Sequence, residues 1–317
     1  MNKKYVQFAL IPLAISLLLY NPQAAQKSAQ VKELSGFKTF ISQQMEEWEV
    51  PGCAVAIVKD GKVIFAEGFG FRDVRKGLKV TPQTLFAIAS CTKAFTATAI
   101  GILANEGKID WDTPVQDYVS AFKLHDPWAT LRVTVRDLLC HRSGLARHDA
   151  MWYGSSLTMK DIFDRIQYLE PNLDFRSAWQ YSNITYSAVG CLIEQITGKT
   201  WEEFVREKIF NPLGMNSSNF SFEESKTFSD FALPYTSREN EVKELPFRDL
   251  TNIGPAGSIN SNLVDMTQWL QFNLQKGKLG EQQILSEATL NLIHSPQIVM
   301  PGPVQYDELL PSCYGMG

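Results

Sequence analysis

The 317-residue sequence has little of what builds disulfide-stapled or metal-held folds. Its five cysteines are scattered and form no Cys-x-x-Cys pair, which argues against a stapled miniprotein and a cysteine-based zinc site. It has only four histidines, without His-Glu-x-x-His or short His-x-His spacing, so we predict no metal site and structural roles for them. The four are His125, His141, His148 and His294.

Excess charge of either sign is also absent. There are 30 Lys and Arg against 34 Asp and Glu, a formal net charge of −4, and no run of like charges. A nucleic-acid partner is therefore not expected. With 44% hydrophobic and 20% charged residues and no low-complexity linker or internal repeat, the chain is predicted to be globular.

The N-terminal segment, residues 1–25, differs from the rest. Lys3 and Lys4 precede an apolar run from Tyr5 to Tyr20, and a small-residue pair follows at Ala24-Ala25. This pattern is typical of a secretory signal, and an uncleaved membrane anchor is the alternative. Both interpretations predict an exported protein, periplasmic or extracellular. An anchor would also associate the protein with the membrane through this segment. Its removal leaves 28 basic against 34 acidic residues, a net charge of −6.

Local patterns predict one hairpin followed by a mostly helical chain. Apolar β-rich runs flank the turn Asp60-Gly61, from Cys53 to Lys59 and from Lys62 to Phe71. Helical periodicity is found at 31–48, 90–106, 159–169, 186–196, 201–210, 263–274 and 287–293. Strands followed by a helical middle indicate an α/β or α+β fold.

Ser90 is the candidate nucleophile, because Ser90-Cys91-Thr92-Lys93 opens a helix that is apolar all round. Ser90 and Lys93 share one helix face, and burial would lower the pKa of the lysine. The same spacing at Ser35/Lys38 and Ser120/Lys123 lacks this buried setting. A helix-capping serine with a snorkelling lysine is the alternative. Cys91 is expected to point about 100° away from Ser90 and to pack as a small buried residue.

Tyr181-Ser182-Asn183 is the second candidate element, and it is the one Tyr-x-Asn in the sequence. A tyrosine near a lysine can act as a base, and an asparagine amide can hold a substrate carbonyl. A loop tyrosine followed by a helix-capping polar group is the structural alternative.

Together the two elements resemble the serine β-lactamase and penicillin-binding-protein superfamily, in its class C β-lactamase-related branch. Other segments that agree in order are Leu85–Ala89, Gly107–Asp110, Leu138–Leu145, Asn211–Met215 and Gly254–Gly257. The resemblance covers roughly residues 30–317 and implies an antiparallel sheet flanked by helices plus a mostly helical domain. It divides the chain into 30–85 for the first part of the sheet domain, 86–250 for the helical domain and 251–317 for the return.

The resemblance also implies the chemistry. Ser90 attacks a carbonyl and is acylated, Lys93 and Tyr181 take and return the proton, and Asn183 binds the substrate amide. Substrates would be β-lactams, D-amino-acid peptides or esters, with no cofactor.

One family feature is not found, namely a Lys or His, a small residue and Gly on a late core strand. The matches Lys59-Asp60-Gly61 and Lys278-Leu279-Gly280 lie in a turn and a polar loop. The resemblance therefore predicts a C-terminally truncated chain that lacks the last strands. It leaves open a catalytically silent fragment that only binds penicillin or peptidoglycan-like peptides, and a zinc hydrolase is a more distant alternative.

Overall fold

The computed structural model describes residues 34–238, 241–302 and 312–317. The chain divides into two units, Met1–Ser35 and Gly36–Gly317. Of the first unit, Leu34 and Ser35 are described, so the predicted signal or anchor at residues 1–25 lies outside the described residues. The second unit carries the fold and the site.

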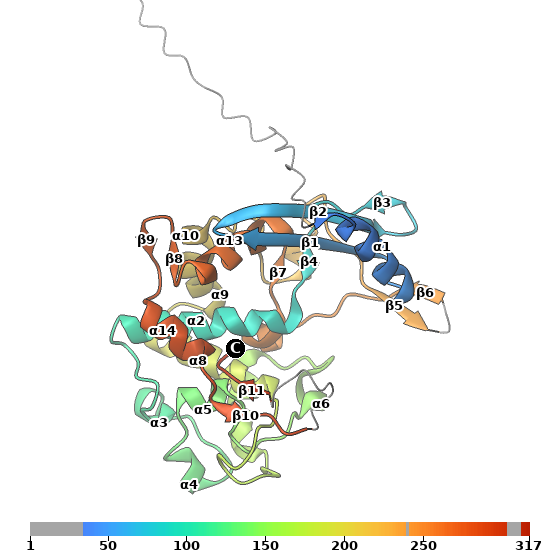
Figure 1. Ribbon diagram of the computed structural model, residues 1–317. Coiled ribbons are helices and arrows are strands. Elements are labelled where there is room, and N and C mark those ends of the chain that lie inside the picture. The colour runs from blue at the N-terminus through green and yellow to red at the C-terminus, as the bar shows by residue number, and fades with distance from the viewer. Residues whose placement is uncertain (1–33, 239–240, 303–311) are drawn as a thin grey trace, which may run out of the picture. The chain divides into compact units, whose positions relative to one another are not determined.

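The second unit mixes helices with short antiparallel sheets (Figure 1), so the predicted α/β class is confirmed. The helices are α1 (Phe37–Glu47), α2 (Thr92–Asn105), α3 (Val115–Tyr118), α4 (Pro127–Thr130), α5 (Val135–Leu139), α6 (Asp149–Trp152), α7 (Met159–Arg165), α8 (Asn183–Thr197), α9 (Trp201–Val205), α10 (Asn211–Leu213), α11 (Phe222–Ser225), α12 (Gly254–Gly257), α13 (Leu263–Leu274) and α14 (Glu287–His294). The strands are β1 (Gly52–Lys59), β2 (Lys62–Asp73), β3 (Leu78–Lys79), β4 (Phe86–Ala87), β5 (Tyr235–Arg238), β6 (Glu241–Glu244), β7 (Asn260–Ser261), β8 (Lys278–Leu279), β9 (Gln282–Gln283), β10 (Ile298–Val299) and β11 (Cys313–Tyr314). The 3-10 turns are η2 (Ala89–Cys91), η3 (Ile166–Tyr168) and η5 (Thr251–Ile253), and η4 (Arg206–Phe210) is a π-helical turn.

The long hairpin forms as its turn sequence predicts. Asp60 and Gly61 both have positive φ, 51° and 70°, which suits the two-residue turn that follows the twist of paired strands. β1 and β2 pair antiparallel from Gly52↔Gly70 to Lys59↔Lys62, and β3 adds to β2. α1 packs on this sheet through Phe37, whose ring lies 5.3 Å from that of Phe65, and α13 packs against β1 and β2.

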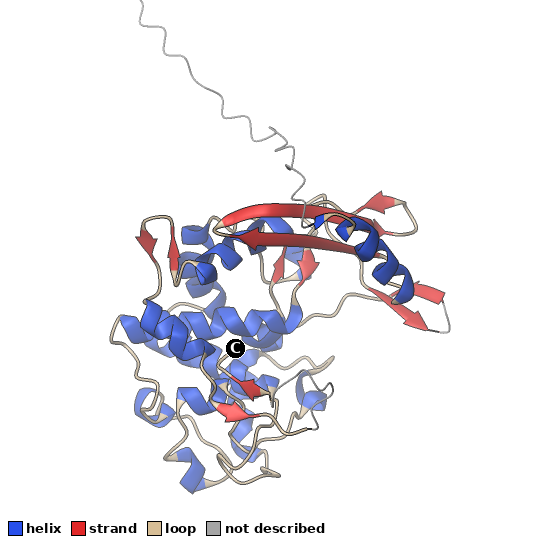
Figure 2. Cartoon of the chain, in the orientation of Figure 1, coloured by secondary structure: helices blue, strands red, loops and turns tan. Residues whose placement is uncertain are grey.

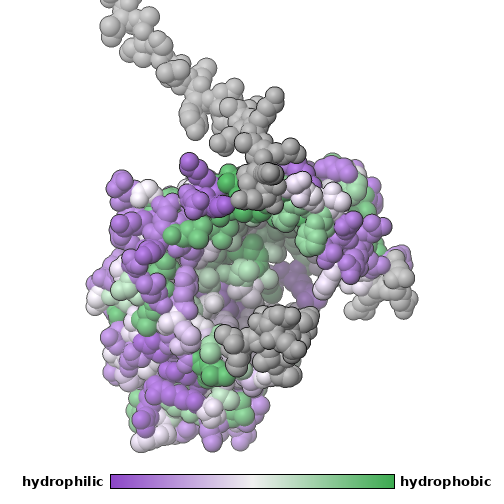
Figure 3. Space-filling model, viewed as in Figure 1, coloured by the Kyte–Doolittle hydropathy of each residue, from purple (hydrophilic) through white to green (hydrophobic). Residues whose placement is uncertain are grey.

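The helix α2 passes through the core of the second unit. Eleven of its 14 residues are buried, because apolar or small side chains occupy every face. α8, α9, α12 and α14 pack around it. Figure 2 shows few strands below α2, where helices and loops predominate. Figure 3 shows hydrophobic surface gathered beneath the β1–β2 hairpin on the same face.

Close approach of α8 and α12 depends on Gly190. A Cβ there would lie 2.4 Å from Pro255 Cγ and 2.9 Å from Met159 Sδ, so no larger residue fits without displacing α12. This contact fixes the main chain of α12 beside α2.

No helix in residues 34–238, 241–302 and 312–317 combines the length and the apolar character needed to cross a bilayer.

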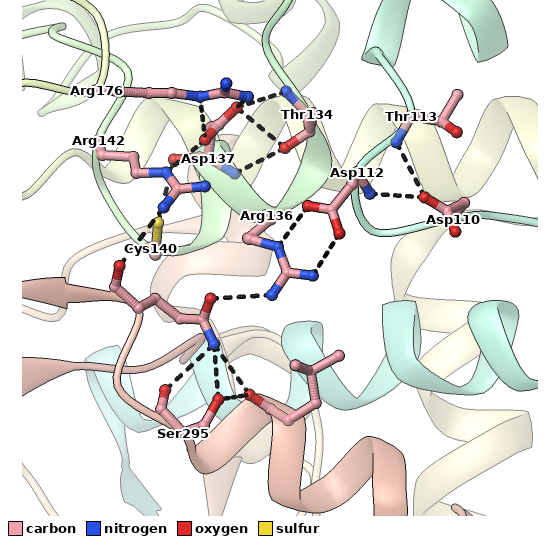
Figure 4. A network of polar contacts seen from close by, with 12 residues as sticks. Asp110, Asp112, Thr113, Thr134, Arg136, Asp137, Cys140, Arg142, Arg176 and Ser295 are labelled. Atoms are coloured by element: carbon pink, nitrogen blue, oxygen red, sulfur yellow. Dashed lines mark hydrogen bonds and ion pairs between the residues drawn. The ribbon is translucent and has the colours of Figure 1, made fainter.

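A buried carboxylate ties together the loops below α2 (Figure 4). Asp137 is fully buried and accepts hydrogen bonds from Arg142, from Arg176 Nη2 at 2.7 Å and from Thr134 N at 2.9 Å. Burial raises the pKa of Asp137, but the hydrogen bonds from Arg176, Thr134 and Arg142 outweigh it and leave the pKa below its usual range.

We expect Asp137→Ala to lower the free energy of unfolding by about 3–5 kcal/mol, because it removes the buried carboxylate that accepts from the Thr134 N–H and pairs with Arg142 and Arg176. The measurement is urea unfolding at pH 7. Asp164→Ala is the control, because its carboxylate pairs with Lys160 and both side chains are exposed, so about 1 kcal/mol or less is expected. Equal losses in both variants would contradict the role of Asp137.

Candidate active site

Ser90 is exposed at the start of the central helix, in the turn η2. The residue before it, Ala89, has φ 46°, a left-handed conformation that a residue with a Cβ rarely adopts. Hydrogen bonding holds this turn in place, since Ile88 N–H donates to Ile259 O at 3.0 Å. Backbone strain of this kind is typical of functional turns, and no sequence pattern indicated it here.

Lys93 lies one turn beyond Ser90 and is almost completely buried, with 1% of its surface exposed. Its Nζ lies 2.8 Å from Asn183 Oδ1, 2.8 Å from Ala256 O and 3.3 Å from Ser90 Oγ. Burial lowers the pKa of Lys93 to about 7, and the positive charge of Arg147 adds to this effect.

These three contacts satisfy an ammonium, which donates to all three oxygens, and equally a neutral amine. A neutral amine has two N–H donors and one lone pair, and the site offers two oxygen acceptors and one hydroxyl. The two short contacts use both donors, so the lone pair is left facing Ser90. Lys93 is therefore placed to accept the proton of Ser90 once it has lost its own.

Tyr181 comes from the loop before α8 and touches the same hydroxyl. Its OH lies 2.7 Å from Ser90 Oγ, and Lys93 Nζ lies 4.7 Å from the centre of its ring. Burial raises the pKa of Tyr181, although the hydrogen bond between Tyr181 and Ser90 and the charge of Arg147 act in the other direction. The phenol is therefore suited to pass a proton on while staying neutral, with Lys93 as the base.

Asn183 is the first residue of α8, and its side chain is almost fully buried. Because Oδ1 accepts from Lys93, the amide NH₂ is the group that remains for a ligand. The structure thus brings Ser90, Lys93, Tyr181 and Asn183 together, although the two elements lie about ninety residues apart in the sequence.

A functional group that sequence reasoning missed is the carbonyl of Ala256 in α12. It accepts from Lys93, while the carbonyl of Pro255 accepts from Thr96 Oγ1 at 2.7 Å. Main-chain groups have no residue signature. The sequence signal for this group is the segment Gly254–Gly257, one of the segments that carry the family resemblance.

Cys91 is exposed, so the prediction of a buried packing residue is wrong. The reason is that the chain around Ser90 is a 3-10 turn at the surface, and the α-helix begins only at Thr92.

Among the described residues, no three His, Cys, Asp or Glu side chains are grouped so as to hold a metal ion.

The charge of Arg147 is expected to lower the pKa of Lys93, the base of the site. Its guanidinium lies 5.1 Å from the centre of the Tyr181 ring, and its charge lowers the pKa of Lys93. In Arg147→Gln that pKa should rise, so less Lys93 is neutral at low pH. We expect acylation of Ser90 to slow about two- to threefold at pH 6.5 and to match the wild type above pH 9.

The measurement is the rate of covalent labelling of Ser90 against pH. Arg132→Gln is the control, because Arg132 also lies over an aromatic ring, that of Trp128, and its charge is not among those that shift the pKa of Lys93. An unchanged pH profile in Arg147→Gln would contradict the role of its charge.

The fold and this arrangement of serine, buried lysine, tyrosine and asparagine define the class of active-site-serine proteins with the β-lactamase and penicillin-binding-protein fold. The family model described as Beta-lactamase matches residues 37–313. The chain therefore belongs to the beta-lactamase family.

Individual relatives agree with this assignment. The chain is 31% identical over 293 residues to "Unguisins hydrolase ungD'" of Aspergillus campestris (strain IBT 28561), covering 88% of this chain and 53% of that protein. It is 29% identical over 241 residues to "Protein flp" of Staphylococcus aureus (strain MW2), covering 74% and 48%. The chain thus spans about half the length of these curated relatives.

Solved structures show the same fold. The octameric penicillin-binding protein homologue from Pyrococcus abyssi superposes with a TM-score of 0.75 at 30% identity, covering 90% of this chain and 64% of that one. FmtA from Staphylococcus aureus gives a TM-score of 0.67 at 26% identity, covering 81% and 69%.

Proposed function

We propose that this protein is an exported serine hydrolase that forms an acyl-enzyme at Ser90 with amide, ester or β-lactam substrates. The observation that carries the proposal is the surroundings of Lys93 Nζ, where two acceptors fix the amine and the third contact is the Ser90 hydroxyl. A buried lysine that merely packed would not need a serine at this position.

In the acylation step, Ser90 Oγ attacks the substrate carbonyl carbon and its proton passes to Lys93, directly or through Tyr181. The Asn183 NH₂ holds the acyl side of the substrate. As the tetrahedral intermediate collapses, the bond to the leaving nitrogen or oxygen breaks, and that atom takes the proton back through Tyr181. Water then attacks the ester at Ser90, with the same groups acting as base and acid, and releases the acid product.

A cavity that begins at Ala89 has the size and character of an organic-ligand site, although Ser90, Lys93, Tyr181 and Asn183 are not part of its lining. The cavity, of about 650 Å³, is lined by Ala89, the residue before Ser90, and by Gly257 and Ser258. Its remaining walls are mostly apolar and include Phe220 and Phe222. Cavities of this size and character are typical of small-molecule or peptide sites.

The test uses three probes on the folded chain: a fluorescent penicillin, a p-nitrophenyl ester and a D-alanyl amide. The names of two compared proteins, a hydrolase and a penicillin-binding protein homologue, support this choice. We expect at least one probe to give a mass adduct on the peptide that contains Ser90. Turnover identifies an enzyme, an adduct without release identifies the silent binding alternative, and an adduct on another residue would contradict the proposal.

Export is proposed from the N-terminal pattern of residues 1–25. Expression with this segment should place the protein outside the cytoplasm, and N-terminal sequencing distinguishes a cleaved signal from a retained anchor. Recovery only from the cytoplasm would contradict export.

A further inference from the structure

His141 holds the chain on both sides of Tyr181. Its carbonyl accepts from Gln180 N–H at 2.8 Å, and its Nδ1 accepts from Ser182 N–H at 3.2 Å. Its ring also lies against the ring of Tyr181, with 4.6 Å between their centres. One residue thus fixes the residues before and after Tyr181 and supports the side chain between them.

The hydrogen bonds that His141 accepts from Gln180 and Ser182 depend on an uncommon backbone conformation. His141 has φ 61°, in the left-handed region. The next residue is anchored at both of its main-chain groups, since Arg142 N–H donates to Asp137 O at 3.2 Å and Arg142 O accepts from Arg176 N–H at 2.9 Å. The buried network of Figure 4 therefore fixes the loop that carries His141.

The protonation state of His141 excludes it as the base. Because Nδ1 accepts a hydrogen bond, the neutral ring carries its proton on Nε2. Burial lowers the pKa of His141 to about 3, and the charges of Lys93 and Arg147 act in the same direction. The ring is completely buried, and its neighbours include Tyr186 and Tyr314.

A side chain selected only for packing would not bury an unpaired N–H, as the ring of His141 does. Nε2 is buried and has no hydrogen-bond partner within the described part of the chain, and leaving a buried N–H unpaired is unfavourable. A phenylalanine would fill similar space without that cost, but it could not accept from Ser182. The useful atom of His141 is therefore Nδ1.

We propose that His141 is a positioning residue for Tyr181, which keeps the tyrosine OH within 2.7 Å of Ser90 Oγ. The inference rests on the proposed function, because its consequence is the rate of Ser90 acylation. It assigns His141 a role beyond the structural one expected from the sequence.

The test compares three substitutions. Asparagine places Oδ1 close to the position of Nδ1 and tolerates left-handed φ, whereas glutamine places its oxygen one bond farther away and alanine has no acceptor. We expect His141→Ala and His141→Gln to lower the acylation rate constant about 100-fold with little change in KM, and His141→Asn to recover most of the rate.

The second arm repeats His141→Ala in a Tyr181→Phe background. A residue that acts through the Tyr181 hydroxyl should have less than about a threefold further effect there. Thermal unfolding of each variant is followed in parallel, and if His141→Ala does not fold, the Asn and Gln pair carries the comparison.

An additive loss in the Tyr181→Phe background, or equal rates for the Asn and Gln variants, would overturn the positioning role. It would leave the proposed function intact as long as the wild type still labels Ser90. A wild type that labels with none of the probes would overturn both.

Discussion

Ser90→Ala is expected to abolish the covalent adduct and to lower turnover by about 10⁴-fold or more. The reason is that, within the described part of the chain, no other hydroxyl or thiol makes the contacts that Ser90 makes with Lys93 and Tyr181. The structure should otherwise persist, because the Ser90 side chain is exposed. Intact-mass analysis after incubation with an ester probe and a fluorescent penicillin measures the adduct.

A matched control is available in the same chain. Ser120 stands three residues before Lys123, as Ser90 does before Lys93, but both lie exposed in a loop. Ser120→Ala should therefore label as the wild type does. Labelling that persisted in Ser90→Ala would contradict the assignment of the nucleophile.

Lys93→Met is expected to lower the acylation rate about 10³-fold, because it removes the base and keeps the shape of the side chain. It should also stabilise the protein. Burial holds the pKa of Lys93 about 3.5 below its ordinary value, which corresponds to a cost on the order of 5 kcal/mol for the charged amine. Two oxygens lose their donor in the variant, so we expect a net gain of about 1–2 kcal/mol.

The pH dependence of this gain is a sharper readout. Between pH 7 and about pH 10.5 the unfolded chain keeps the lysine proton and the folded protein has lost it, so the wild type becomes more stable as pH rises. Below pH 7 both states hold the proton and the cost is complete. Urea unfolding should therefore show the advantage of Lys93→Met vanishing and then reversing between pH 7 and pH 9.5, because the wild type gains about 3 kcal/mol over this range. A constant advantage would contradict the neutral amine.

Elements set by local pattern could be predicted from the sequence. The turn Asp60-Gly61 fixes the β1–β2 hairpin, and the apolar periodicity of Leu263–Leu274 gives the bounds of α13 as the structure has them. The helix expected at 31–48 is described as Phe37–Glu47, because Gly36 with φ 83° precedes its first turn. The domain division at residues 86 and 251 stays a prediction.

The site was predictable only where chemistry resides in side chains. The Ser90 to Lys93 spacing and the Tyr-x-Asn element indicated the four residues that the structure brings together. The carbonyl of Ala256 and the left-handed turn at Ala89 are main-chain features that depend on how α12 packs against α2. The hydrogen bonds between His141 and the loop of Tyr181 join residues about forty positions apart, which no local pattern encodes.

The central claim is that a neutral Lys93 makes Ser90 a nucleophile. The most direct test is the second-order rate constant for labelling of Ser90 by a small fluorophosphonate, measured from pH 5 to pH 9 with the modified peptide identified at each pH. The account predicts labelling at Ser90 that rises with pH and is half-maximal near pH 7, as the pKa of Lys93 requires. A rate that does not change across this range, or a label on another residue, would contradict it.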